Sequence, residues 1–232
     1  MIPLYDTNTR NSIPFVNYFI ILSNIFVFIL QLSAPNIGEF IMAHGFISAR
    51  FSIANPLTWA QILSSMWMHG GYLHIIFNMW FLHIFGDNVE DSLGHIRYLL
   101  FYIVCGVIAV GAQYAVDPTS TVPLIGASGA IAGVTGAYLH LYRHSRIVAL
   151  VPSFLGLWHK IALPSWIFLG YWFALQVISG VGSLASIKIN DGGVAFFAHI
   201  GGFVCGYVLV MFWPTKKKSE DTEYEKLVRL YN

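Results

Sequence analysis

Charged residues are scarce in this sequence. Of its 232 residues, 12 are Lys or Arg and 11 are Asp or Glu, so 10% are charged, whereas soluble domains carry about 25%. So few charges cannot cover the surface of a globule in water. With 56% hydrophobic residues and a mean hydropathy of +0.66, the composition predicts an integral membrane protein. The net charge of +1 argues against the basic face of a nucleic-acid-binding protein, so no nucleic-acid partner is expected.

Cysteine and intramembrane acids are also rare. The two cysteines, Cys105 and Cys205, lie in apolar stretches, so a disulfide framework is not expected. No Asp or Glu falls inside an apolar stretch. This absence argues against a catalytic aspartate pair and against the carboxylates of proton or cation transporters. A transporter or channel stays a minor alternative, because the inner halves of the stretches offer little polarity beyond His83 and His140.

Six apolar stretches are long enough to cross a membrane as helices. They lack the alternation of barrel strands, so the predicted fold class is all-α, a bundle of six transmembrane helices. The stretches cover residues 14–33, 70–86, 96–116, 124–142, 161–181 and 193–213. The connection 36–69 is too long for an ordinary loop and is rich in aromatic residues, which predicts that it lies partly in the outer membrane interface.

The basic residues are distributed unevenly along this layout. With the N-terminus in the cytoplasm, ten of the 12 Lys and Arg fall on the inside, and Arg50 and Lys188 fall outside. This asymmetry predicts that both termini are cytoplasmic. The expected organisation is a short cytoplasmic N-terminus (1–13), a membrane domain (14–213) and a cytoplasmic tail (214–232).

Three polar residues are expected at one depth in the membrane. His74, Ser128 and His199 each lie three to six residues past the outer start of the second, fourth or sixth stretch. At 1.5 Å per residue they would lie roughly 5–10 Å below the outer surface. A hydroxyl and two imidazoles could therefore share one layer.

Each of these residues also has a purely structural explanation. Ser128 lies in a run of small residues typical of close helix packing, and His199 could simply bind a neighbouring helix. The two explanations become compatible if Gly202 and Gly206 meet the glycines of the fourth stretch. Small residues would then bring Ser128 and His199 within hydrogen-bonding distance. The facing glycines are Gly129, Gly133 and Gly136.

The second stretch begins with a set of histidines. His74 and Asn78 are four residues apart and project from one helix face, while His69 lies five residues earlier near the surface. A metal site is disfavoured, because two imidazoles five residues apart share a face poorly and no carboxylate or cysteine completes a ligand set. We expect no metal and no other cofactor.

Together these motifs resemble the rhomboid family of intramembrane serine proteases, in its basic six-span bacterial form. The resemblance covers about residues 40–213. The matching pieces are His69, His74 and Asn78; Gly126-Ala127-Ser128-Gly129; Ala198-His199 with Gly202 and Gly206; and, after the second stretch, the segment from Gly86 to Gly94, which resembles the family's loop there.

The resemblance implies a role for each of these residues. Ser128 would be the nucleophile and His199 the general base of a dyad. His74, Asn78 and the backbone N–H of Ser128 would form the oxyanion hole. The same resemblance assigns supporting roles to His69, Gly126, Gly129, Gly202 and Gly206.

The resemblance also implies substrates and a location. Single-span membrane proteins would be cut in or near the outer end of their helix, by a site that opens to the extracytoplasmic side. Membrane lipid would be the other partner, and a prokaryotic plasma membrane the expected location. Phe77, Trp166 and Trp172 are candidate gate residues for lateral access. The alternative is an inactive rhomboid-like protein that binds substrates or serves quality control.

The sequence departs from the family pattern at two positions. The first loop reads Trp59-Ala60-Gln61 where many members carry Trp-Arg. Ala132 stands where some relatives place a tyrosine beneath the histidine, so another ring would have to support His199. If a third group orients His199, it is not an Asp from a membrane span.

Overall fold

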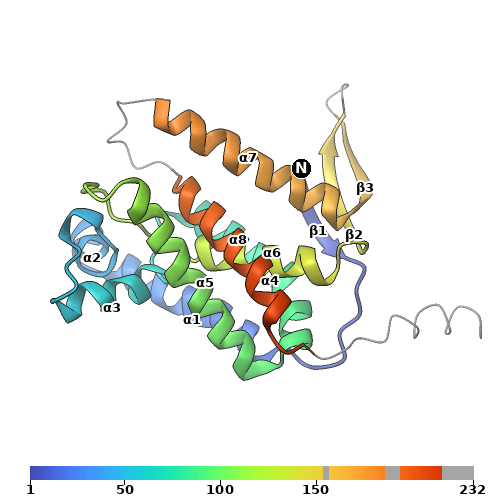
Figure 1. Ribbon diagram of the computed structural model, residues 1–232, viewed down its shortest axis with the longest axis horizontal. Helices are drawn as coiled ribbons and strands as arrows, with labels where there is room; N and C mark the ends of the chain where they lie inside the picture. The colour runs from blue at the N-terminus through green and yellow to red at the C-terminus, as the bar shows by residue number, and fades with distance from the viewer. Residues whose placement is uncertain (154–156, 186–193, 216–232) are drawn as a thin grey trace, which may run out of the picture.

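The computed structural model describes residues 1–153, 157–185 and 194–215, and it is mostly helical (Figure 1). One helix lies largely within each of the six apolar stretches. These helices are α1 (Phe15–Ser33), α4 (Tyr72–Leu93), α5 (His95–Val116), α6 (Ser128–Leu141), α7 (Ser165–Ala185) and α8 (Phe196–Phe212). The 36–69 connection folds into α2 (Ile37–His44), a 3-10 turn (Ser48–Arg50) and α3 (Pro56–Ser65).

Three of the described helices, α1, α5 and α7, are long and apolar enough to cross a membrane, and α8 is a shorter apolar helix of 17 residues. α6 has 14 residues, and α4 carries acidic residues near its end. The protein is therefore a membrane protein, whereas its six-span count stays a prediction. Lys188 and residues 216–232, which contribute to the predicted orientation, lie outside the described residues.

The expectation of an all-α fold is wrong in one respect, because the described chain also contains a three-stranded antiparallel sheet. Its strands are β1 (Ile2–Asp6), β2 (Arg146–Pro152) and β3 (Trp158–Pro164), in the order β1-β2-β3. Ile147 and Ala149 of β2 are fully buried, so this strand contributes to the core. The pairing of Ile2 with Leu150 joins segments far apart in the sequence, which local patterns do not reveal.

Three helix boundaries also differ from expectation. α4 continues through the segment expected as a loop and ends at Leu93, and the next residue, Gly94, has a φ of 82° that favours glycine. α6 begins at Ser128 rather than near residue 124, because Leu124 forms a β-bridge with Phe46. α7 begins at Ser165 rather than near 161, because the preceding residues belong to β3.

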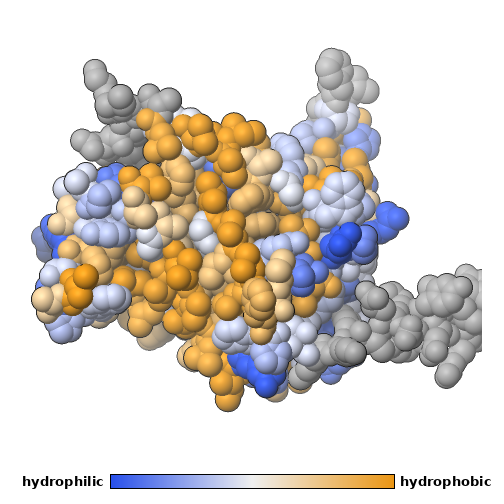
Figure 2. Space-filling model, in the orientation of Figure 1, coloured by the Kyte–Doolittle hydropathy of each residue, from blue (hydrophilic) through white to orange (hydrophobic). Residues whose placement is uncertain are grey.

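Helix α6 lies at the centre of the bundle, where it packs against α4, α5 and α8. Every residue from Gly129 to Tyr138 is buried. Figure 2 shows apolar side chains over the viewed face of α5, α7 and α8, with hydrophilic residues on one side near the sheet and on the other near α2 and α3. The helix that begins with Ser128 is therefore enclosed by protein, while its neighbours α5 and α8 carry exposed apolar side chains.

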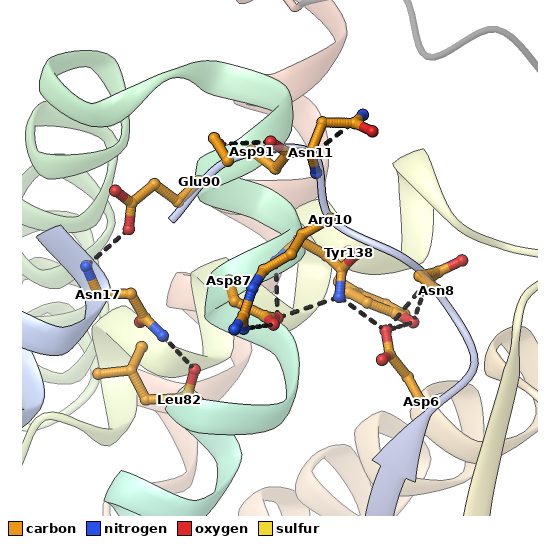
Figure 3. A network of polar contacts seen from close by, with 12 residues as sticks. Asp6, Asn8, Arg10, Asn11, Asn17, Leu82, Asp87, Glu90, Asp91 and Tyr138 are labelled. Atoms are coloured by element: carbon orange, nitrogen blue, oxygen red, sulfur yellow. Dashed lines mark hydrogen bonds and ion pairs between the residues drawn. The ribbon is translucent and has the colours of Figure 1, made fainter. Parts of the chain in front are cut away.

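The end of α4 is bound to the N-terminal segment by three carboxylates (Figure 3). Glu90 is fully buried and accepts hydrogen bonds from the backbone N–H groups of Asn17 and Val16 in the first turn of α1, at 2.7 and 3.0 Å. Asp91 accepts from the backbone N–H of Asn11, and Asp87 forms an ion pair with Arg10 at 2.9 Å. Residues 1–13 thus pack against the membrane domain.

Glycines bring α6 and α8 together, as the sequence predicts. A methyl group added at Gly202 would overlap the carbonyl oxygen of Gly129, and one added at Gly206 would overlap that of Gly133. The two backbones are therefore in direct contact, which only glycine permits at these positions.

We expect Gly206→Ala to lower the free energy of unfolding by about 1–3 kcal/mol, the usual cost of overpacking, because the two helices must separate. Thermal unfolding in detergent measures the effect. Gly111→Ala in α5 is the matched control, since a methyl group there meets nothing within 4 Å. Equal melting temperatures for the two variants would contradict the close packing.

Candidate active site

Ser128 and His199 are in hydrogen-bonding contact across the interface of α6 and α8. Nε2 of His199 lies 2.8 Å from Oγ of Ser128. Ser128 is the first residue of α6, and His199 lies in the first turn of α8. Both side chains are half-buried. The contact spans 71 residues of sequence and depends on the glycine packing below it.

The first loop holds the segment that leads to Ser128. Phe46 and Leu124 exchange two backbone hydrogen bonds, at 2.7 and 3.1 Å. The carbonyl of Ser65, at the end of α3, accepts from the backbone N–H of Gly126 at 2.9 Å. The long 36–69 connection therefore braces the extended chain before α6 and determines where that helix begins.

Gly126 allows His74 to approach Ser128. Its φ of 123° favours glycine. A Cβ atom there would lie 2.8 Å from Cε1 and Nε2 of His74 and 3.5 Å from Oγ of Ser128. The Nε2 edge of His74 thus faces the backbone beside the serine, and any larger residue at 126 would displace it.

The tautomer of His74 follows from its other nitrogen. The backbone N–H of Gly70 donates to Nδ1 of His74 at 3.3 Å. Because Nδ1 accepts, the proton of the neutral ring is on Nε2. His74 therefore presents an N–H donor towards the space beside Ser128.

Asn78, one turn further along α4, is buried with an unused donor. Among the described residues, no hydrogen-bond acceptor is found for its Nδ2 atom. A buried donor without an acceptor is costly, and it can bind an incoming oxygen without first losing another hydrogen bond. Beside Ser128 there is also a cavity of about 20 Å³, lined in part by Ser65 and Gly126, with space for about one water molecule.

His69, which precedes α4, packs against His74. Its ring is fully buried and meets the ring of His74 edge-on, with centroids 5.1 Å apart. Gln31 of α1 binds both the N–H and the C=O of His69. Burial, with the nearby His74 as a second cause, lowers the pKa of His69 to about 4, so its ring is neutral at pH 7.

Gln176 of α7 is a site residue that the sequence reasoning missed. Its Oε1 atom lies 2.8 Å from Nδ1 of His199, so the imidazole is held from both sides. The one available signal was that Gln176 is the sole amide or charged side chain in α7. That signal identifies a polar residue in an apolar helix, but it cannot name its partner.

The three candidate gate residues occupy different environments. Phe77 and Trp166 are 49% and 55% exposed on the surface. Trp172 is half-buried, with its ring centroid 6.0 Å from that of His199 and 6.1 Å from that of Phe203. Ala132 has no ring to place against His199. Trp172 of α7 supplies an aromatic ring beside His199 instead.

The described residues contain no group of three or more His, Cys, Asp or Glu placed to hold a metal ion. The arrangement instead combines a hydroxyl, an imidazole in contact with it, and nearby N–H donors. These groups are the ones that nucleophilic catalysis and the stabilisation of an oxyanion require.

Comparison with known proteins identifies the family to which this helical membrane protein belongs. The family model described as a rhomboid domain matches residues 56–215. The putative rhomboid protease YdcA of Bacillus subtilis is 33% identical over 162 residues, which cover 69% of each chain. The rhomboid protease GluP of the same bacterium is 28% identical over 200 residues, covering 85% of this chain. RHOMBOID-like protein 6, mitochondrial, of Arabidopsis thaliana is 28% identical over 154 residues.

The chain belongs to the rhomboid family. It spans 69% of the length of YdcA, but 42% of RHOMBOID-like protein 6 and 34% of GluP. At the level of the family, the relatives named as proteases support intramembrane proteolysis.

Proposed function

We propose that this protein is an intramembrane serine endopeptidase that cleaves membrane protein substrates through a dyad of Ser128 and His199. The observation that carries the proposal is the 2.8 Å contact between Oγ of Ser128 and Nε2 of His199. A serine needs an adjacent base to attack at neutral pH, and this imidazole is the base in reach.

The reaction proceeds in two halves. In the first, Oγ of Ser128 attacks the carbonyl carbon of the scissile peptide while its proton passes to Nε2 of His199. The tetrahedral oxyanion collapses, the C–N bond breaks, and the leaving amine takes the proton from His199. In the second half a water molecule attacks the acyl ester and gives a proton to His199. The bond between the acyl carbon and Oγ then breaks, Ser128 takes its proton back from His199, and the acid product departs.

The oxyanion would be bound by three donors. These are Nε2–H of His74, Nδ2–H of Asn78 and the backbone N–H of Ser128. The position of Ser128 at the start of α6 adds the free N–H groups and the positive dipole end of the helix. The His74 tautomer and the unpartnered Asn78 support this assignment, because both donors are available before any substrate arrives.

We further propose that the six long helices span a prokaryotic plasma membrane, with both termini in the cytoplasm and the site open to the extracytoplasmic side. The starts of α4, α6 and α8 would then lie near the outer surface, where water is available. Substrates would be single-span proteins cut near the outer end of their helix. That helix must unwind locally, since a helical backbone does not expose its carbonyls to attack.

Cleavage of a single-span reporter in lipid vesicles by the purified protein tests the proposal. Mass spectrometry should locate one cut near the outer end of the reporter helix, and a fluorophosphonate probe should label Ser128. Ser128→Ala should do neither. If wild type neither cuts several reporters with unstable helices nor reacts with the probe, the protein is an inactive rhomboid relative instead.

A further inference from the structure

We propose that Gln176 is a positioning residue that selects the tautomer and orientation of His199; the inference rests on the proposed protease function. The imidazole of His199 makes two hydrogen bonds, one through each nitrogen. Nε2 meets Oγ of Ser128 and Nδ1 meets Oε1 of Gln176, both at 2.8 Å.

The amide oxygen decides which nitrogen carries the proton. A carbonyl oxygen can only accept a hydrogen bond, so Nδ1 of His199 must be the donor. In a neutral imidazole the other nitrogen, Nε2, then has its lone pair free. That lone pair faces Ser128, where it can receive the hydroxyl proton. The opposite tautomer would place a proton on Nε2 and could not act as the base.

A neutral amide fits the surroundings of this site better than a carboxylate does. Neither α7 nor α8 contains an Asp or Glu, and α5 and α6, which also pack against α8, contain none either. Gln176 is only half-buried, so a carboxylate introduced there can stay ionised, at a desolvation cost that the natural amide avoids. Gln176 fixes the ring without adding a charge.

The same face of α7 supplies a second contact to His199. Trp172 precedes Gln176 by four residues, so the two side chains lie one above the other on the helix. The indole of Trp172 lies 6.0 Å from the imidazole, with their planes inclined by 33°. One helix therefore supplies both the hydrogen-bond acceptor at the edge of the ring and an aromatic neighbour. A second glutamine near α8, Gln113 of α5, accepts from the backbone N–H of Ala198 and not from the ring.

The test compares Gln176→Met, which keeps the length but removes the acceptor, with Gln176→Glu, which keeps an acceptor and removes the donor. We expect kcat of Gln176→Met to fall about tenfold, the value of one hydrogen bond, with KM within about twofold of wild type. Fluorophosphonate labelling of Ser128 should slow by the same factor. Gln176→Glu should keep kcat within about threefold at neutral pH. The acid limb of its pH–rate profile should move to higher pH, because a carboxylate favours the imidazolium.

Gln113→Met is the matched control. It removes a glutamine that also holds α8, so it should lower the melting temperature without moving the pH profile. A role of Gln176 in packing alone would give the same pattern in its own variants, and that result would overturn the proposal. A Gln176→Glu variant as slow as Gln176→Met, with an unshifted profile, would do so as well.

A measurement on the wild type needs no variant to fold. With ¹⁵N-labelled histidine, NMR should show His199 protonated at Nδ1 and unprotonated at Nε2 at neutral pH. The opposite tautomer would overturn the inference. Failure of the protease proposal is seen separately, as equal activity of wild type and Ser128→Ala.

Discussion

Replacing His199 by alanine should lower kcat by on the order of 10⁴-fold or more while the protein stays folded. Effects of this size follow removal of the base in other serine proteases, because the serine then has no group to take its proton. In this protein the imidazole is the base within 2.8 Å of Oγ, and α5, α6, α7 and α8 contain no carboxylate to take its place. Cleavage of a reporter in vesicles under single-turnover conditions measures the loss.

The matched control is His140→Ala. His140 lies on α6, where its ring packs edge-on against Tyr207 of α8 with centroids 5.4 Å apart. His140→Ala therefore removes the same type of side chain from the interface of α6 and α8, but away from Ser128. We expect it to retain activity within a few-fold of wild type. Equal losses in the two variants would mean that any damage to this interface stops the reaction, and His199 would lose its assigned role.

Asn78→Leu should lower kcat by about 10²–10³-fold, the usual cost of losing one oxyanion-hole donor. Its effect on stability should run the other way. The Nδ2 atom of Asn78 is buried and has no acceptor within the described structure, so leucine removes an unpaired polar group without breaking a hydrogen bond there. We expect a melting temperature equal to or above that of wild type, with KM little changed.

Opposite changes in rate and stability are typical of a group retained for catalysis. Asn24→Leu is the control, because Asn24 is also a buried asparagine and its Nδ2 donates to the carbonyl of Ile20 within α1. That variant should leave kcat unchanged. If Asn78→Leu cleaves as fast as wild type, His74 and the backbone of Ser128 would have to suffice for the oxyanion.

The helices were predictable because a membrane solvent imposes a simple rule on sequence. About 20 apolar residues form one helix, and one helix lies largely within each of the six stretches. The boundaries were less predictable. The segment before Ser128 is apolar enough for a helix, yet its bridge to Phe46 and the φ of Gly126 keep it extended.

The sheet was missed for a related reason. Arg146–Pro152 becomes a strand by pairing on one side with the N-terminal residues Ile2–Asp6 and on the other with Trp158–Pro164. The partner on the N-terminal side is more than 140 residues away in sequence. A strand is completed by hydrogen bonds to other segments, whereas a helix satisfies its own backbone groups.

The sequence by itself determined the class of the protein and the candidate residues for its proposed chemistry. Scarce charge required a membrane, and the family motifs with the expected depths singled out His74, Ser128 and His199. Only the tertiary structure decided their distances and their remaining partners. It placed Gln176 and Trp172 of α7 against His199, and Gly126 between His74 and Ser128. The physical reason is that a hydrogen bond between helices depends on how they pack, and their packing depends on contacts distributed along the whole chain.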